Sequence, residues 1–183
     1  AFANHYALYV LVEDYIKNGF TRERKGQYEK YEGARFSDLF RRQRELPFGA
    51  KLQNHALNSR LNDEFAKYFP TLGIRPIMRD LKEQRYWINE GLLVVKVAKE
   101  GQETEFNVAE AIVDIINSYV ETKRSAFEAF LDACKKMSEL SEDNATGAID
   151  FIREQLQPNV DARIFEIVSF AILKAFYGEQ PIF

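Results

Sequence analysis

Side chains able to recognise nucleic acid are concentrated between residues 35 and 60. In the run FSDLFRRQRELPFGAKLQNHALNSRLNDEF, a short helix, a turn that contains Pro and Gly, and a second, polar helix follow in order. This is the order of a helix-turn-helix, whose second helix presents polar side chains to base edges. Asn and Gln pair with adenine, and Arg pairs with guanine, in the major groove. The expected base-reading residues on the second helix are Gln53, Asn54, Asn58 and Arg60.

Phosphate contacts are expected from the cations around this helix. The predicted set is Arg35, Arg41, Arg42, Arg44 and Lys51, joined by Lys96 in a later hairpin. Three of these arginines share one short helix with only two acids, Asp38 and Glu45, and a helix cannot turn all three toward them. We therefore expect cationic charge to remain for phosphates. The alternative is an ordinary solvated face, which every surface helix needs.

The charge distribution favours the same class of ligand. Residues 17–60 hold eleven Lys or Arg and five Asp or Glu, a net charge of +6, although the whole chain carries −3. Aromatic residues are interleaved with these cations, at Tyr28, Tyr31, Phe36, Phe40 and Phe48. Residues 1–90 hold 16 basic and 12 acidic side chains (+4), and residues 91–183 hold 9 and 16 (−7). Only the first half is expected to approach a phosphate backbone.

Hydrophobic periodicity predicts a mainly helical chain. Helices are expected over residues 4–17, 37–44, 51–68, 76–87, 108–121, 122–140, 145–157 and 161–177. The run LLVVKVAK, followed by ETEFNV, predicts one short β-hairpin. The expected fold class is mainly α: a helix-turn-helix or winged-helix-like part, the hairpin as its wing, and a helical bundle after it.

Two regions are expected, with a boundary near residues 100–107, where charge and element type change. Residues 1–103 would be the recognition region and residues 104–183 a helical region. Cys134 is the only cysteine, so an internal disulfide and a thiolate zinc site are excluded and a reducing cytoplasm is the expected location. No apolar run approaches the roughly 20 residues of a membrane span, so no membrane contact is expected.

No catalytic or metal-binding constellation is visible in the sequence. The two histidines, His5 and His55, are fifty residues apart, and no H-E-x-x-H, glycine-rich phosphate loop or G-x-S-x-G is present. The carboxylates do not form the strand-borne Asp and acidic-x-Lys pair with which a nuclease holds Mg²⁺. We expect no metal site and no cofactor within these residues. By itself the chain has the character of a binding module.

Three segments resemble the amino-terminal part of a family of type II restriction endonucleases. They are NHALNSRLNDEF, RYWINEGLLVV and NVDARIFEIVSFAILKAFYGEQPIF. The resemblance covers nearly all of the chain in general character. It implies a helical DNA-recognition region followed by a PD-(D/E)xK nuclease core, which opens with a helix that bears a glutamate. Glu166 matches that glutamate, so a metal-site role is implied for it; a salt bridge to Arg163 or Lys174 is the alternative.

The same resemblance implies double-stranded DNA as ligand, a homodimer, and Mg²⁺ as the cofactor of the parent enzyme. The metal-binding acids of that family are missing, so we expect a fragment that binds DNA without cutting it. Pro181, Ile182 and Phe183 would then approach the first core strand. The alternative function is a non-catalytic protein-interaction or transcription-regulator domain, in which the acidic helical half binds a protein partner.

Overall fold

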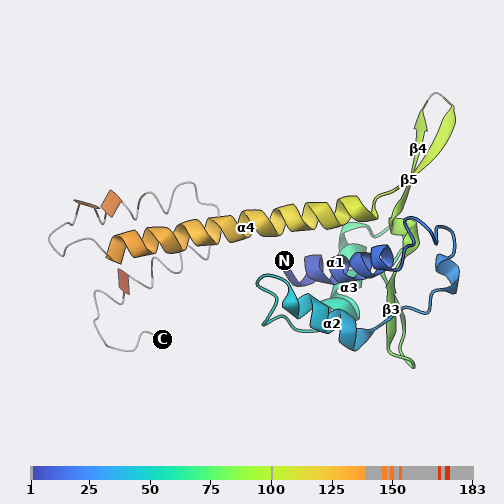
Figure 1. The fold of residues 1–183 in the computed structure, drawn as a ribbon, viewed down its shortest axis with the longest axis horizontal. Helices are drawn as coiled ribbons and strands as arrows, with labels where there is room; N and C mark the ends of the chain where they lie inside the picture. Colours follow the sequence, from blue (N-terminus) through green and yellow to red (C-terminus); the bar gives the residue numbers. More distant parts are fainter. Residues whose placement is uncertain are drawn as a thin grey trace. The chain divides into compact units, whose positions relative to one another are not determined.

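The computed structural model describes residues 2–99 and 101–138, together with residues 146, 147, 149, 150, 153, 169, 172 and 173. The chain divides into two compact units, Ala1–Thr122 and Lys123–Phe183. In the first unit, the described residues form helices α1, α2 and α3, a three-stranded sheet and a two-stranded hairpin (Figure 1). Helix α4 begins in the first unit and ends in the second. The fold therefore contains more sheet than the single hairpin expected from the sequence.

Helix α1, Phe2–Lys17, forms the centre of the first unit. Its apolar residues are not confined to one stripe, and a helix of that kind is stable only when it is enclosed. Contacts join it to α2, α3, strand β3 and the helical turn at residues 56–60. Its buried side chains are Tyr6, Ala7, Tyr9, Val10, Leu11, Val12 and Tyr15. The helix predicted over residues 4–17 is confirmed.

The three-stranded sheet is antiparallel, and its strands in spatial order are β1 (Ala34–Arg35), β3 (Arg85–Ile88) and β2 (Ile77–Asp80). The helix predicted over residues 76–87 is therefore wrong, because these residues form the β2–β3 hairpin. Side chains alternate between the faces of a strand, and Tyr86 and Ile88 are buried on the face toward α1. Tyr28 donates a hydrogen bond to the Ile88 carbonyl at 2.9 Å, which ties the loop after α1 to β3.

Helix α2, Phe36–Glu45, follows β1 directly and packs on α1, so the helix predicted over residues 37–44 is confirmed. The helix predicted over residues 51–68 begins later than expected. A π-helical turn, Ala56–Arg60, leads into α3, Leu61–Tyr68. Before it, two consecutive turns occupy the chain, closed by hydrogen bonds from Gly49 N to Leu46 O at 2.8 Å and from Leu52 N to Gly49 O at 2.9 Å.

The predicted β-hairpin is confirmed as β4, Val94–Lys99, paired with β5, Gln102–Asn107. It projects away from α1 and the three-stranded sheet (Figure 1). Side chains 95–98 and 102–107 are exposed. At its base, Asn107 Nδ2 donates to Tyr15 OH at 3.0 Å, so the hairpin is anchored on α1.

Helix α4, Ala109–Ser138, is continuous, so the predicted break between residues 121 and 122 is wrong. The sequence around that point, VETKRS, contains no Gly or Pro that would end a helix. Asn107 Oδ1 accepts a hydrogen bond from Ala109 N at 3.0 Å and so caps the start of α4. The first turns pack on α1: Ile116 and Val120 are buried, and the Tyr119 ring lies 5.8 Å from the Phe2 ring.

The helices predicted over residues 145–157 and 161–177, and the bundle they would form, lie outside the described residues apart from isolated positions. The boundary near residues 100–107 stays a prediction. Among the helices that the structure describes, none combines the length and the apolar character needed to cross a membrane.

Gly33 lies where the loop after α1 enters the sheet, and its geometry predicts a specific loss of stability on substitution. Its φ is +88°, and a Cβ there would lie 2.8 Å from Trp87 Cε3 and 2.9 Å from Tyr86 O. We expect Gly33→Ala to lower the free energy of unfolding by about 2–4 kcal/mol, the combined cost of a left-handed backbone and of overpacking. Urea unfolding followed by circular dichroism measures this loss.

Gly26→Ala is the matched control for that substitution. Gly26 also has a positive φ, +79°, but nothing lies within 4 Å of a Cβ built on it. Only the backbone cost of about 1–2 kcal/mol is expected there. Equal losses for the two variants would contradict the packing of Trp87 over Gly33.

Candidate nucleic-acid interface

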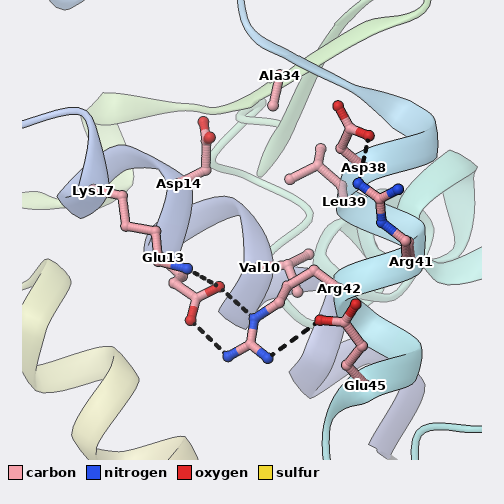
Figure 2. Close-up of a pocket in the computed structure, with 10 residues that line it drawn as sticks. All are labelled: Val10, Glu13, Asp14, Lys17, Ala34, Asp38, Leu39, Arg41, Arg42 and Glu45. Carbon is pink, nitrogen blue, oxygen red and sulfur yellow. Dashed lines mark hydrogen bonds and ion pairs between the residues drawn. The ribbon is translucent and has the colours of Figure 1, made fainter.

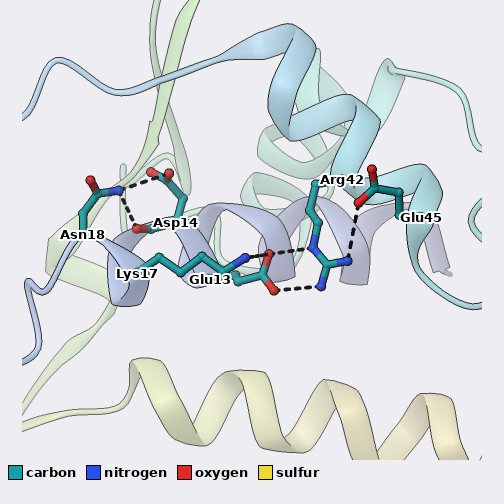
Figure 3. Close-up of polar contacts among 6 residues, drawn as sticks. All are labelled: Glu13, Asp14, Lys17, Asn18, Arg42 and Glu45. Carbon is teal, nitrogen blue, oxygen red and sulfur yellow. Dashed lines mark hydrogen bonds and ion pairs between the residues drawn. The ribbon is translucent and has the colours of Figure 1, made fainter.

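The junction of α1 and α2 is held by a carboxylate that lies between two cations (Figure 3). Glu13 on α1 accepts two hydrogen bonds from Arg42 on α2, from Nε to Oε2 and from Nη2 to Oε1, each at 2.9 Å. Lys17 Nζ lies 3.1 Å from Glu13 Oε2, and Glu45 Oε2 lies 3.7 Å from Arg42 Nη1. A bidentate pair fixes orientation as well as distance. Arg42 therefore joins the two helices.

This pairing sets the protonation of both groups. Burial alone would raise the pKa of the Glu13 carboxyl, but hydrogen bonds and charge from Arg42 and Lys17 outweigh burial and hold that pKa below its ordinary value of 4.5. The hydrogen bonds that Arg42 donates to Glu13 raise the pKa of the Arg42 guanidinium in turn. The sequence predicted a phosphate contact at Arg42, whereas the structure places its guanidinium on Glu13.

Asp14, the next residue of α1, is bound by polar side chains. Tyr31 OH donates to Asp14 Oδ2 at 2.5 Å, and Asn18 Nδ2 donates to Oδ1 at 3.2 Å. Burial raises the pKa of Asp14, and these two hydrogen bonds offset only part of that effect. The contact with Tyr31 ties α1 to the loop that precedes the sheet.

A pocket of about 240 Å³ opens between α1 and α2 over these groups (Figure 2). Its lining residues are Val10, Glu13, Asp14, Lys17, Ala34, Asp38, Leu39, Arg41, Arg42 and Glu45. Each cation in this lining has a carboxylate partner: Glu13 holds Lys17 and Arg42, and Asp38 Oδ1 lies 3.1 Å from Arg41 Nη2. The pocket is therefore poorly suited to an anionic ligand.

The three arginines of α2 have three different surroundings. Arg42 is bound to Glu13, and Arg41 is exposed and paired with Asp38. Arg44 is also exposed and donates from Nε to the Ala50 carbonyl at 2.8 Å. An exposed ion pair such as Arg41–Asp38 contributes little to stability, and Arg44 has no carboxylate partner among the described residues. A phosphate role for Arg41 and Arg44 stays a prediction, whereas the guanidinium of Arg42 is already bound by Glu13.

The predicted base-reading residues divide between surface and interior. Gln53 and Arg60 are exposed, and Asn54 is half-buried. Asn58 accepts a hydrogen bond from Tyr86 OH at 3.0 Å, so its side chain is turned toward the sheet. Residues 51, 53 and 54 precede the π-helical turn and do not share a helical face with Arg60. The expectation of one polar reading helix over residues 51–68 is corrected accordingly.

Lys96 is compensated within its hairpin. It lies on β4 directly opposite Glu105 on β5, and its Nζ is 3.3 Å from Glu105 Oε1. A second carboxylate, that of Glu103, belongs to the same strand as Glu105. The hairpin therefore offers less positive charge to phosphates than Lys96 suggested from the sequence.

Seven cations of residues 17–60 are exposed and have no carboxylate at ion-pair distance among the described residues. We call them the unpaired cations: Arg24, Lys25, Lys30, Arg35, Arg44, Lys51 and Arg60. The other four cations of the segment are paired: Lys17 and Arg42 with Glu13, Arg22 with Glu110, and Arg41 with Asp38. The net positive charge of the segment is thus carried mainly by side chains that remain accessible to a ligand.

Sequence reasoning missed Arg85 and Trp87 because it assigned them to a helix. Both lie on β3 and are half-buried, on the face opposite to that of Tyr86 and Ile88. The signal that could have found them is the succession of aromatic and β-branched residues in Tyr86, Trp87 and Ile88, a composition that favours a strand.

No group of three His, Cys, Asp or Glu within the described residues is placed to hold a metal ion. Glu166 lies outside the described residues, so its metal-site role stays a prediction.

Comparison of the chain with protein-family models, with curated proteins and with solved structures finds no match. Any functional assignment therefore depends on the charges and contacts described above and on the resemblance of the three sequence segments.

The Glu13–Arg42 pair predicts a pH-dependent contribution to stability. We expect Glu13→Gln, which keeps the shape and removes the charge, to lower the free energy of unfolding at neutral pH by about 1–2 kcal/mol. Because folding lowers the pKa of Glu13, the contribution is complete above the ordinary value of 4.5 and is lost as the pH falls through the folded value. Urea unfolding at a series of pH values measures both effects.

Asp38→Asn is the control, since it removes a carboxylate from an exposed pair on the same surface. Asp38 is 55% exposed, and its loss is expected to cost about 0–0.5 kcal/mol. If Glu13→Gln cost no more than Asp38→Asn, the pair between α1 and α2 would not be a structural contact.

Proposed function

We propose that the first unit, residues 1–122, binds duplex DNA as the recognition region of a type II restriction endonuclease. The set of unpaired cations carries this proposal. Duplex DNA bears a negative charge about every 1.7 Å of its axis, and each cation that neutralises a phosphate releases a bound counterion. A cation without a carboxylate partner makes that exchange without breaking an ion pair.

The proposed contacts are of two kinds. Phosphate contacts are assigned to Arg35, Arg41, Arg44 and Lys51, and Arg42 is left out because Glu13 occupies its guanidinium. Base contacts are assigned to Gln53, Asn54 and Arg60, and Asn58 is left out because its side chain accepts from Tyr86.

A helix-turn-helix-like pair is the arrangement we propose for these contacts. Its first helix is α2 and its second is the continuous stretch of Ala56–Arg60 and α3. The connection over residues 46–55 is longer than the three or four residues usual for the motif. The loop itself therefore carries contacts, among them Lys51 and Gln53. The β4–β5 hairpin is the proposed wing, with Lys96 as a weak phosphate contact.

Cleavage is proposed for the parent protein and not for these residues. Its support is the resemblance of the three segments, which implies Mg²⁺ as cofactor, Glu166 near the metal, and a homodimer acting on both DNA strands. A two-fold dimer would recognise a two-fold symmetric site.

A second candidate function, protein interaction, is favoured by one observation. Val95, Val97 and Phe106 lie on one face of the β4–β5 hairpin and are 42, 45 and 53% exposed. A small apolar patch of this kind is a common feature of binding surfaces. A stable complex with a protein partner, together with failure to retain DNA, would favour this alternative.

The DNA-binding proposal predicts a steep dependence of affinity on salt. Fluorescence anisotropy of a labelled random-sequence duplex, titrated with the chain at several salt concentrations, gives the slope of log affinity against log salt. We expect the double substitution Arg44→Ala with Lys51→Ala to make that slope shallower by about 1.8, since each lost phosphate contact removes about 0.9.

Lys17→Ala with Arg22→Ala is the matched control, because it changes the net charge by the same amount. Both cations are already paired, Lys17 with Glu13 at 3.1 Å and Arg22 with Glu110 at 3.4 Å. We expect a smaller change of slope than in the test variant. The proposal fails if the chain does not retain duplex DNA at low salt, or if the two double variants are indistinguishable.

A further inference from the structure

The three-stranded sheet has an outer face whose side chains, Arg35 excepted, have no role in the proposed helix-turn-helix-like pair. Side chains alternate along each strand, and Ala34, Tyr86 and Ile77 belong to the inner face, toward α1. The intervening residues form what we call the outer sheet face: Arg35 on β1, Arg85 and Trp87 on β3, and Met78 and Asp80 on β2.

Two arginines oppose each other on this face. Arg35 and Arg85 are partners in the β1–β3 register. The next position along is a hydrogen-bonded one, because Phe36 N donates to Gln84 O at 2.9 Å. Hydrogen-bonded and non-hydrogen-bonded positions alternate in an antiparallel pair, so Arg35 and Arg85 occupy the kind in which side chains are closer. Like charges placed opposite each other are destabilising.

Neither guanidinium is neutralised. Arg85 donates from Nη1 to the Gly33 carbonyl at 2.9 Å, and Arg35 is exposed. Among the described residues, no carboxylate lies at ion-pair distance from either one. Asp80 is the cross-strand partner of Arg85 on its other side, but its Oδ1 accepts from Lys82 N at 2.9 Å and from Glu83 N at 3.2 Å and so caps the β2–β3 turn.

One aromatic and one aliphatic side chain, both partly exposed, lie beside the two cations. Trp87 is two residues from Arg85 on the same face, and its ring packs over Gly33, where a Cβ would come within 2.8 Å of Cε3. Met78, opposite Trp87 on β2, is 39% exposed. A cationic pair next to a flat aromatic surface suits a sugar-phosphate backbone, which is charged on one side and less polar along the sugars.

We infer that the outer sheet face is a second contact of the first unit with duplex DNA, in which Arg35 and Arg85 share adjacent phosphates of one strand. An anion between the two guanidinium groups removes their mutual repulsion and is held by charge-assisted hydrogen bonds. Trp87 and Met78 lie along the neighbouring sugars. This inference rests on the proposed DNA binding, and it adds a site that the helical segment does not contain.

The substitution Arg35→Glu distinguishes a loss of DNA affinity from a loss of protein stability. It places a carboxylate opposite Arg85, and an opposite-charge cross-strand pair stabilises a sheet. We expect the midpoint of urea unfolding to rise while affinity for a random-sequence duplex falls and the salt slope becomes shallower by about 1.8, the equivalent of two phosphates. A substitution that merely damaged the fold would lower both stability and affinity.

Trp87 supplies an independent readout, because it is the only tryptophan of the chain. Titration of the 183-residue chain with unlabelled duplex is expected to quench its fluorescence and to protect it from acrylamide. Without DNA, iodide should quench Trp87 more strongly than caesium does, and Arg35→Glu should reduce that difference. Ionic quenching reports the electrostatic potential at the outer sheet face, and the titration reports whether DNA binds there.

Lys67→Glu is the matched control, with the same change of charge at an exposed position of α3. It should leave the Trp87 signal unchanged. If the chain binds DNA with a steep salt slope but Arg35→Glu behaves like Lys67→Glu and Trp87 does not respond, the inference is overturned and the proposed function stands. If the chain binds no duplex, both fail; quenching by an acidic peptide alone would mean that a protein occupies the face.

Discussion

Enclosure of α1 is the constraint on which the rest of the first unit depends. The helix buries aromatic and aliphatic residues on most of its circumference, so the sheet, α2, the turn at residues 56–60 and the start of α4 must all cover it. Its polar residues then lie at the edges of these contacts. Glu13 and Asp14 lose part of their hydration there and need partners, since a partly buried carboxylate without one is costly. Arg42 and Tyr31 supply them.

The same constraint decides which cations remain available to a ligand. Arg41, Arg42 and Arg44 look equivalent in sequence, yet only the second faces α1 and meets Glu13. Its pairing is a structural requirement of the α1–α2 contact, whereas Arg41 and Arg44 lie on the solvated side of α2. A count of charges in residues 17–60 therefore overstates the number of possible phosphate contacts. The count still predicts that the surface charge is positive, because the unpaired cations outnumber the paired ones in that segment.

Local sequence patterns correctly predicted the elements that are formed by residues close together in the chain. Periodicity and neighbouring turn residues are enough to predict the helices at residues 4–17 and 37–44 and the β4–β5 hairpin. The helix predicted for residues 77–87 was wrong for a physical reason. The segment IMRDLKEQRYW contains acceptable helix formers and apolar residues at helical spacing, so its local pattern favours a helix. Its strands are stabilised instead by pairing with each other and with Ala34–Arg35, some fifty residues earlier. Tertiary pairing of that kind overrides a weak intrinsic preference. The helical stretch predicted from residue 51 begins only at residue 56 for a local reason, because two consecutive turns around Gly49 occupy the residues before it.

Because residues 76–87 were assigned to a helix, the sequence did not predict that Arg85 lies opposite Arg35 in the sheet. On a helix, Arg85 would be one more solvated cation with no relation to Arg35. On β3 it is fixed opposite Arg35, in a register that the burial of Tyr86 and Ile88 on the other face does not allow to slip by one residue. The apolar core thus forces two positive charges together on the surface, and the sheet cannot separate them without exposing its buried side. A bound anion relieves that conflict without disturbing the core. The position of the proposed phosphate contact at Arg35 and Arg85 is therefore set by hydrophobic register rather than by the local density of basic residues.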